Sequence, residues 1–195
     1  TAYEIRPRDW SSDVCSSDLI DPPRAARLIQ ELRSIHSRSW GAVGVVVNVP
    51  LEEMNEIAGL CDLDHIQVCG DEPPDYCRAL ERPVIKALRL SGEEVLSEQL
   101  FAPAHYGARR VLVDTHRPGM YGGTGETCDW PALAPYLSQA ILAGGLTPEN
   151  VSAAVSQASP WGVDVSSGVE RNKRKDHQLI REFLGAVHAP GGVTR

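Results

Sequence analysis

Residues 139–170 read QAILAGGLTPENVSAAVSQASPWGVDVSSGVE, and this stretch decides the fold. It opens with an apolar run over 139–146 that predicts a strand and runs into a pair of glycines. Residues 149–157 have helical spacing, with Thr147 as the expected N-cap and Pro148 as the first helical residue. Residues 161–170 predict a second strand. Strand, helix and strand in this order predict a βαβ unit, in which the two strands run parallel.

The same alternation extends over the chain from residue 20 onward. Further apolar runs complete a set of six predicted strands, each followed by a predicted helix: 43–48, 65–70, 83–90 and 109–115. One more helix, over 20–36, starts at Asp21 and precedes the first of these strands. Repeated units of this kind form either an open doubly wound sheet or a (β/α)8 barrel, and six strands alone favour the open sheet.

Residues at the ends of the strands favour the barrel instead. Five positions lie at or just past the C-terminal ends of different strands: Gln67, Lys86, Asp114, Gly144-Gly145 and Asp164–Gly168. In a barrel these ends meet at one mouth, where active sites lie. We therefore predict an α/β fold of the TIM (β/α)8-barrel family, here incomplete, with about six parallel strands.

The composition narrows the class of protein. The chain has 195 residues with 42% hydrophobic and 23% charged residues, which is typical of a globular domain with a sizeable core. No apolar run approaches the roughly 20 residues that span a bilayer, so no membrane partner is expected. The net charge of −7 argues against a nucleic-acid partner. The N-terminus lacks the apolar stretch of a signal peptide, so we expect a cytoplasmic protein.

The cysteines do not predict a metal site. They are scattered and odd in number, and no Cys-x-x-Cys pair occurs: Cys15, Cys61, Cys69, Cys77 and Cys128. We expect them to behave as small buried apolar side chains in a reducing compartment. No metal site is therefore predicted.

Two glycine-containing loops predict a phosphate site. The Gly144-Gly145 pair and the run Ser166, Ser167 and Gly168 follow neighbouring strands, and both can offer backbone N–H groups or hydroxyls to an anion. One such loop alone would suit a tight turn equally well. Two on adjacent strands favour a phosphorylated small molecule as the ligand.

Three charged residues lie at strand ends or within strands. Asp114 follows an apolar strand, where burial would raise its pKa and make it a candidate general acid. Asp164 follows Val163 at the end of a strand in the same way, but a role in organising its loop is at least as good an interpretation as a catalytic one. Lys86 lies within an apolar strand and needs an anionic partner.

On three stretches in combination, the chain from Ile20 to His188 resembles phosphoribosylanthranilate isomerase of tryptophan biosynthesis: VLVDTHRPGMYGGTGETCDW, ILAGGLTPENV and GVDVSSGVE. The resemblance implies a TIM barrel without metal or organic cofactor. It implies an Amadori rearrangement, in which an aminoaldose phosphate becomes an aminoketose phosphate. Asp114 would be the general acid that opens the ribose ring, and the two loops, with Asp164 beside them, would hold the substrate phosphate. Association with other tryptophan-pathway enzymes would fit the same resemblance.

The sequence departs from the family at its N-terminal end. The family's general base is a cysteine in a first-strand motif like Lys-Ile-Cys-Gly-Ile-Thr, and no Lys-x-Cys-Gly occurs in this chain. The arginine expected before the second helix falls at about Asp18, and the histidine expected after Gln67 is replaced by Cys69. Catalysis by this chain is therefore expected to be impaired. A non-catalytic phosphate-binding fragment and another phosphate-binding barrel enzyme remain as alternatives.

Residues 1–19 show neither a helical nor a strand period. The run DVCSSDL at 13–19 corresponds, when back-translated, to the end of a common sequencing adapter. We therefore interpret 1–19 as a non-native segment outside the barrel wall, so that Cys15 is not the missing base. The domain would cover 20–188 as a partial isomerase barrel, and 189–195 would form a flexible tail.

Overall fold

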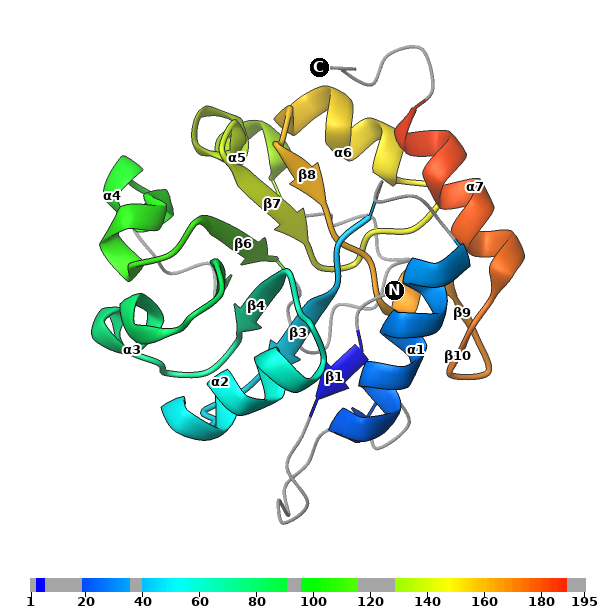
Figure 1. Ribbon diagram of the computed structural model, residues 1–195. Helices are drawn as coiled ribbons and strands as arrows, with labels where there is room; N and C mark the ends of the chain where they lie inside the picture. Colours follow the sequence, from blue (N-terminus) through cyan, green and yellow to red (C-terminus); the bar gives the residue numbers. More distant parts are fainter. Residues whose placement is uncertain (1–2, 6–18, 36–39, 91–95, 116–128, 189–195) are drawn as a thin grey trace. The chain divides into compact units, whose positions relative to one another are not determined.

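The computed structural model of the chain describes residues 3–5, 19–35, 40–90, 96–115 and 129–188, of which 3–5 and 19 are described by their backbone only. The chain divides into two compact units. The first comprises residues 1–87 and 103–109, and the second comprises 88–102 and 110–195. Figure 1 shows the elements of both units.

The first unit is built on parallel strands in the order β2-β1-β3-β4-β5. Their bounds are Tyr3–Ile5 for β1, Leu19–Ile20 for β2, Val43–Val46 for β3, His65–Val68 for β4 and Val84–Arg89 for β5, which ends in the second unit. In β3 and β4, buried residues alternate with half-buried ones. The predicted strands at 43–48, 65–70 and 83–90 are thereby confirmed.

Helices of the first unit follow the predicted pattern. They are α1 (Pro22–Ile35), α2 (Leu51–Leu60) and α3 (Pro74–Ala79), and η1 (Pro103–Tyr106) is a single 3-10 turn. The predicted start of α1 at Asp21 is confirmed, because its Oδ1 accepts a hydrogen bond from Arg24 N at 3.0 Å. Apolar residues of α2 pack into a core with the strands, and Met54 is completely buried. Cys61 and Cys77 are buried as predicted, whereas Cys69 is half-buried.

The N-terminal residues correct one expectation. Residues 1–19 were expected to lie outside the barrel wall, but Tyr3 pairs with Gly44 and Glu4 with both Val45 and Leu19. The backbone of β1 thus lies inside the sheet, between β2 and β3. Three residues in extended conformation can complete a ladder through backbone hydrogen bonds, whatever their side chains. Residues 6–18, with Cys15, lie outside the described part of the chain.

The second unit contains three further predicted strands, β6 (Arg110–Asp114), β7 (Ala140–Ala143) and β8 (Gly162–Val163), which are parallel neighbours in that order. Its helices are α4 (Glu98–Phe101), α5 (Trp130–Leu137), α6 (Val151–Ala158) and α7 (His177–Val187). A 3-10 turn, η2 (Ser167–Val169), follows β8. A small antiparallel hairpin of β9 (Glu170–Arg171) and β10 (Arg174–Lys175) leads into α7.

Two boundaries in the second unit differ from the prediction. The strand expected over 161–170 is only two residues long, because the chain turns into η2 soon after Val163. The helix expected from Thr147-Pro148 begins at Val151, since residues 148–150 form a turn in which Asn150 N donates to Thr147 O at 3.2 Å. Among the described helices, none is both long and apolar enough to cross a bilayer.

Candidate functional site

The C-terminal ends of β6, β7 and β8 bring Asp114 and Asp164 to the same level of the sheet. Asp114 pairs with Ala143 on β7. Asp164 directly follows Val163, the partner of Leu142, and its N–H donates to Leu142 O at 2.9 Å. The two carboxylates therefore flank Ala143, two strand spacings or about 10 Å apart between Cα atoms. Strand ends at one level of a sheet can direct their side chains toward a shared ligand.

Asp164 has a perturbed ionisation. Its side chain is largely desolvated, which raises the pKa of the carboxyl above its usual value, and the negative charge of Asp114 raises it further. The positive charge of Lys175 acts in the opposite direction. This pattern, a half-buried acid beside a second acid at a strand end, is typical of functional sites.

The loop after β7 has a backbone that only glycine adopts readily. Gly144 and Gly145 have φ angles of 94° and 65°. Asn150 holds this loop from both sides: its Nδ2 donates to Gly145 O at 2.9 Å, and its Oδ1 accepts from Thr147 N at 2.8 Å. Thr115 adds a hydrogen bond from its Oγ1 to Ala143 O at 3.0 Å. No sequence pattern had indicated that Asn150 and Thr115 hold this loop.

The loop after β8 lies directly against the loop after β7. A Cβ atom placed on Gly168 would come within 1.8 Å of Leu146 O and 3.2 Å of Thr147 Cα. Only glycine permits this approach. The two predicted phosphate loops are therefore neighbours in space, as their order along the sheet suggested.

Ser166 and Ser167 open this second loop, and both are exposed. Ser167 begins η2, and Ser166 immediately precedes it. Lys175, on β10, donates hydrogen bonds from Nζ to Ser166 O and Ser166 Oγ, both at 3.1 Å. The Ser166 hydroxyl is thus fixed from one side and open to solvent on the other.

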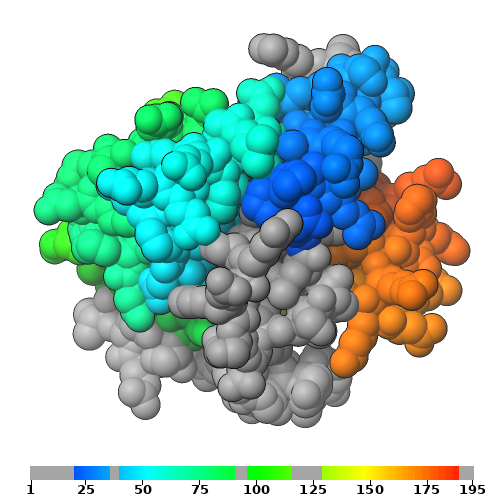
Figure 2. All heavy atoms as spheres, turned by 60° about the horizontal axis from the view of Figure 1, so that its bottom comes forward, coloured from blue at the N-terminus to red at the C-terminus, as the bar shows by residue number. Residues whose placement is uncertain are grey.

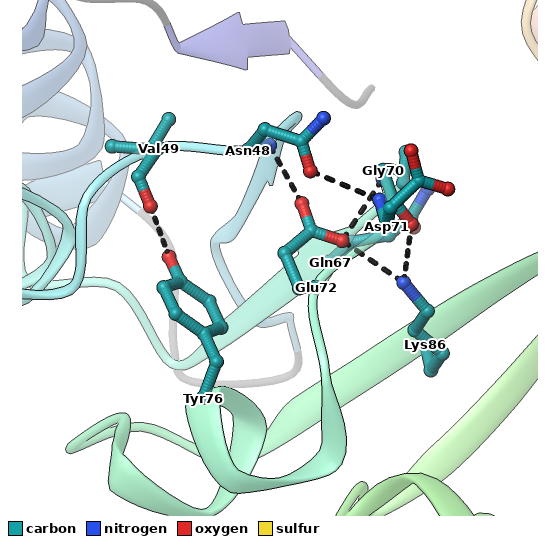
Figure 3. A network of polar contacts seen from close by, with 9 residues as sticks. Asn48, Val49, Gln67, Gly70, Asp71, Glu72, Tyr76 and Lys86 are labelled. Carbon is teal, nitrogen blue, oxygen red and sulfur yellow. Dashed lines mark hydrogen bonds and ion pairs between the residues drawn. The ribbon is translucent and has the colours of Figure 1, made fainter.

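A separate polar network occupies the strand ends of the first unit (Figure 3). Glu72 accepts hydrogen bonds from Asn48 N at 2.7 Å and Gly70 N at 3.0 Å, and pairs with Lys86 Nζ at 2.9 Å. Lys86 also donates to Gly70 O at 2.5 Å. The predicted need of Lys86 for an anionic partner is confirmed, and Glu72 is that partner. Glu72 lies in no period or motif that would have identified it as this partner.

Gln67 and Cys69 belong to the same strand end. Gln67 Nε2 lies 3.4 Å from Cys69 Sγ, as a weak hydrogen bond to sulfur. Asn48, with φ 49°, accepts from Asp71 N at 2.9 Å through its side chain. These contacts order the loops after β3 and β4 in the first unit.

The structure places every predicted site residue in the second unit, at the end of a strand or in the loop that follows it: Asp114, Gly144, Gly145, Asp164, Ser166, Ser167 and Gly168. The two loops are in contact through Gly168, and the negative charge of Asp114 contributes to the raised pKa of Asp164. Most of the glycine-rich stretch at 119–130 falls within 116–128, outside the described residues. The roles assigned to these residues remain predictions.

Comparison with known proteins gives a consistent answer. The family model of N-(5'phosphoribosyl)anthranilate (PRA) isomerase matches residues 16–186. The N-(5'-phosphoribosyl)anthranilate isomerase of Pseudomonas fluorescens is 48% identical over 154 residues, which cover 77% of this chain and 72% of that protein.

Solved structures agree with the sequence comparison. The phosphoribosyl anthranilate isomerase of Thermotoga maritima superposes with a TM-score of 0.73 at 35% identity, covering 87% of this chain and 81% of that one. A second isomerase structure, with 31% identity and a TM-score of 0.69, covers 87% and 80%. It holds reduced 1-(o-carboxyphenylamino)-1-deoxyribulose 5-phosphate.

These similarities confirm the predicted α/β fold of the TIM-barrel family. The match covers most of the chain, including both loops and the ends of β6, β7 and β8. The chain belongs to the N-(5'-phosphoribosyl)anthranilate isomerase family.

Proposed function

We propose that this chain binds N-(5'-phosphoribosyl)anthranilate through its phosphate at the paired loops of the second unit, with Asp114 as the general acid of its isomerisation. The reaction is the Amadori rearrangement of an aminoaldose phosphate to an aminoketose phosphate in tryptophan biosynthesis. The observation that carries the proposal is the contact of Gly168 with Leu146 and Thr147, since it joins both glycine loops beside the two carboxylates.

The loops have the chemistry that a phosphate monoester needs. Gly144 and Gly145 have left-handed backbone, a conformation used where successive N–H groups converge on an anion. Ser166 and Ser167 add exposed hydroxyls next to them. Backbone N–H groups and hydroxyls of this kind can bind a phosphate through hydrogen bonds.

Asp114, at the C-terminal end of β6, is the proton donor of this proposal. Opening the ribose ring requires a proton on the ring oxygen, which a carboxylic acid can deliver. Burial, and next the negative charge of Asp114, raise the pKa of the nearby Asp164 carboxyl, and a perturbed acid of this kind is typical of functional sites. Asp114 delivers the proton in this proposal, while Asp164 organises the loop that follows it.

No motif of the sequence supplies the second group that the reaction needs. The rearrangement also removes a proton from the carbon next to the imine, and no Lys-x-Cys-Gly motif supplies the family's cysteine base. Loss of a general base lowers a rate by typically 10²–10⁴-fold. We therefore propose that the chain as it stands binds phosphorylated ligands but turns substrate over slowly, in the cytoplasm where the pathway's other enzymes would act.

Calorimetry with reduced 1-(o-carboxyphenylamino)-1-deoxyribulose 5-phosphate, the ligand of one solved relative, tests the binding half of this proposal. We expect saturable binding of this ligand, and we expect inorganic phosphate to displace it. Gly168→Ala should abolish the binding. Gly185→Ala in α7 is the matched control, since a Cβ at Gly185 meets nothing within 4 Å. Undiminished binding by Gly168→Ala would show that the phosphate site lies elsewhere.

A further inference from the structure

Lys175 reaches from the β9–β10 hairpin to the start of the phosphate loop. Its Nζ contacts Ser166 O and Ser166 Oγ at 3.1 Å each, and it forms an ion pair with Glu170. The Lys175 and Glu170 side chains are only 18% and 15% exposed. By contrast Arg171, Lys173 and Arg174 on the same hairpin are exposed. The segment that contains the hairpin is orange in Figure 2.

The proton count at this contact is informative. A lysine ammonium has three protons and no acceptor, and here three oxygens accept them. Lys175 therefore has no proton left for a further ligand. Because Ser166 Oγ accepts from Lys175, the single hydroxyl proton of Ser166 remains free to be donated elsewhere.

We propose that Lys175 is a positioning residue of the phosphate site, which fixes the Ser166 hydroxyl as a hydrogen-bond donor to the phosphate monoester. The inference rests on the proposed function of the two loops. The ion pair with Glu170 offsets the lysine charge, so the effect of Lys175 acts through Ser166 rather than through long-range attraction of the anion.

A double-mutant cycle on the full chain tests this mechanism, with inorganic phosphate as the probe and the dissociation constant from calorimetry as the readout. The variants are Lys175→Met, Ser166→Ala and the two combined. Lys173→Met is the matched control, because it removes the same charge from an exposed position of the same hairpin. Circular dichroism of each variant checks that the fold is retained.

We expect Lys175→Met and Ser166→Ala each to weaken phosphate binding about tenfold, the size of one hydrogen bond to a charged group. The combined variant should be no weaker than Ser166→Ala alone, and Lys173→Met should bind within about twofold of the unmodified chain. Lys175→Arg keeps a donor at this position and should recover most of the affinity. If Lys175→Met does not fold, Lys175→Gln takes its place in the cycle, with the same expected loss.

Three results would overturn the inference. Additive losses in the combined variant would show that Lys175 acts by charge alone, and equal losses in Lys173→Met would show the same. Unchanged affinity in Lys175→Met would remove Lys175 from the site while leaving the proposed function intact. If the unmodified chain fails to bind phosphate at all, the proposed function fails and this inference fails with it.

Discussion

Glu72 Oε2 and Lys86 Nζ form an ion pair 2.9 Å long, and only 2% and 8% of these side chains are exposed. The pair connects the loop after β4 with β5, and the hydrogen bond from Asn48 N adds the loop after β3. Each charge is costly to bury, but here the Glu72 carboxylate accepts three hydrogen bonds. The stability of the first unit should depend strongly on keeping both partners together.

Glu72→Gln should lower the free energy of unfolding by about 3–5 kcal/mol, because it leaves the Lys86 ammonium buried without an anion. Urea denaturation at pH 7 measures the loss. Asp75→Asn is the control, since Asp75 pairs with Arg78 at the surface and both side chains are exposed. That change should cost less than about 1 kcal/mol. Equal effects of the two variants would contradict the structural role of the buried pair.

Gly168→Ala should destabilise the second unit and remove phosphate binding, because its Cβ would come within 1.8 Å of Leu146 O. Gly185→Ala should instead stabilise α7 by about 0.5–1 kcal/mol, since glycine weakens a helix interior. Thermal unfolding of both variants provides the comparison. A native-like melting temperature for Gly168→Ala would show that the two loops do not touch.

Asp164→Asn should stabilise the protein at neutral pH. Burial, and next the charge of Asp114, raise the pKa of Asp164, so the folded state binds more protons than the unfolded state between the ordinary and the raised pKa. Stability linked to this group is therefore present below about pH 3.9, the ordinary value for aspartate, and is lost as the pH rises through the raised pKa.

The gain in melting temperature from Asp164→Asn should accordingly be largest at pH 7 and shrink toward pH 4. Asp176 is a control whose pKa is shifted in the opposite direction, because hydrogen bonds from Leu179 N and Gln178 N lower it. Its contribution is present above the ordinary pKa and lost as the pH falls through the lowered one. A gain from Asp164→Asn that does not change with pH would contradict the assignment.

Lys173→Gly should stabilise the β9–β10 hairpin. Asn172 and Lys173 have φ angles of 52° and 59°, the geometry of a two-residue turn in which Asn-Gly is preferred. Relieving the strained lysine should gain about 0.5–1 kcal/mol after the entropy of glycine is counted. A fall in melting temperature on this substitution would show that Lys173 makes a contact that outweighs the strain.

The sequence was informative where a pattern has one physical meaning. Apolar runs over 109–115 and 139–146 predicted buried parallel strands, and Asp114 and Gly144 lie at the C-terminal ends of these strands as expected. The glycines of both loops were found because left-handed backbone and close approach leave few alternatives to glycine.

Side-chain partners across loops could not be predicted in the same way. The position of Lys86 within an apolar strand predicted that it has an anionic partner. The partner itself, Glu72, could not be predicted, because it lies in a loop without periodicity. The role of Asn150 was not predicted, because Thr147 and Pro148 resemble the start of a helix that would include it. In the structure Asn150 precedes α6, and its Oδ1 accepts a hydrogen bond from Thr147 N. β1 was missed because three residues of backbone pairing need no side-chain pattern.

Steady-state turnover of N-(5'-phosphoribosyl)anthranilate tests the central claim, that Asp114 is the acid of this site, most directly. The measurement compares the chain as it stands with a version in which a strand–helix–strand carrying Lys-x-Cys-Gly replaces residues 1–19, and with the same version bearing Asp114→Asn. We predict useful turnover only in the version that carries Lys-x-Cys-Gly and keeps Asp114. Its Asp114→Asn form should have a kcat lower by on the order of 10²–10⁴-fold. Its affinity for inorganic phosphate should stay unchanged. An unchanged kcat in the Asp114→Asn form would contradict the account.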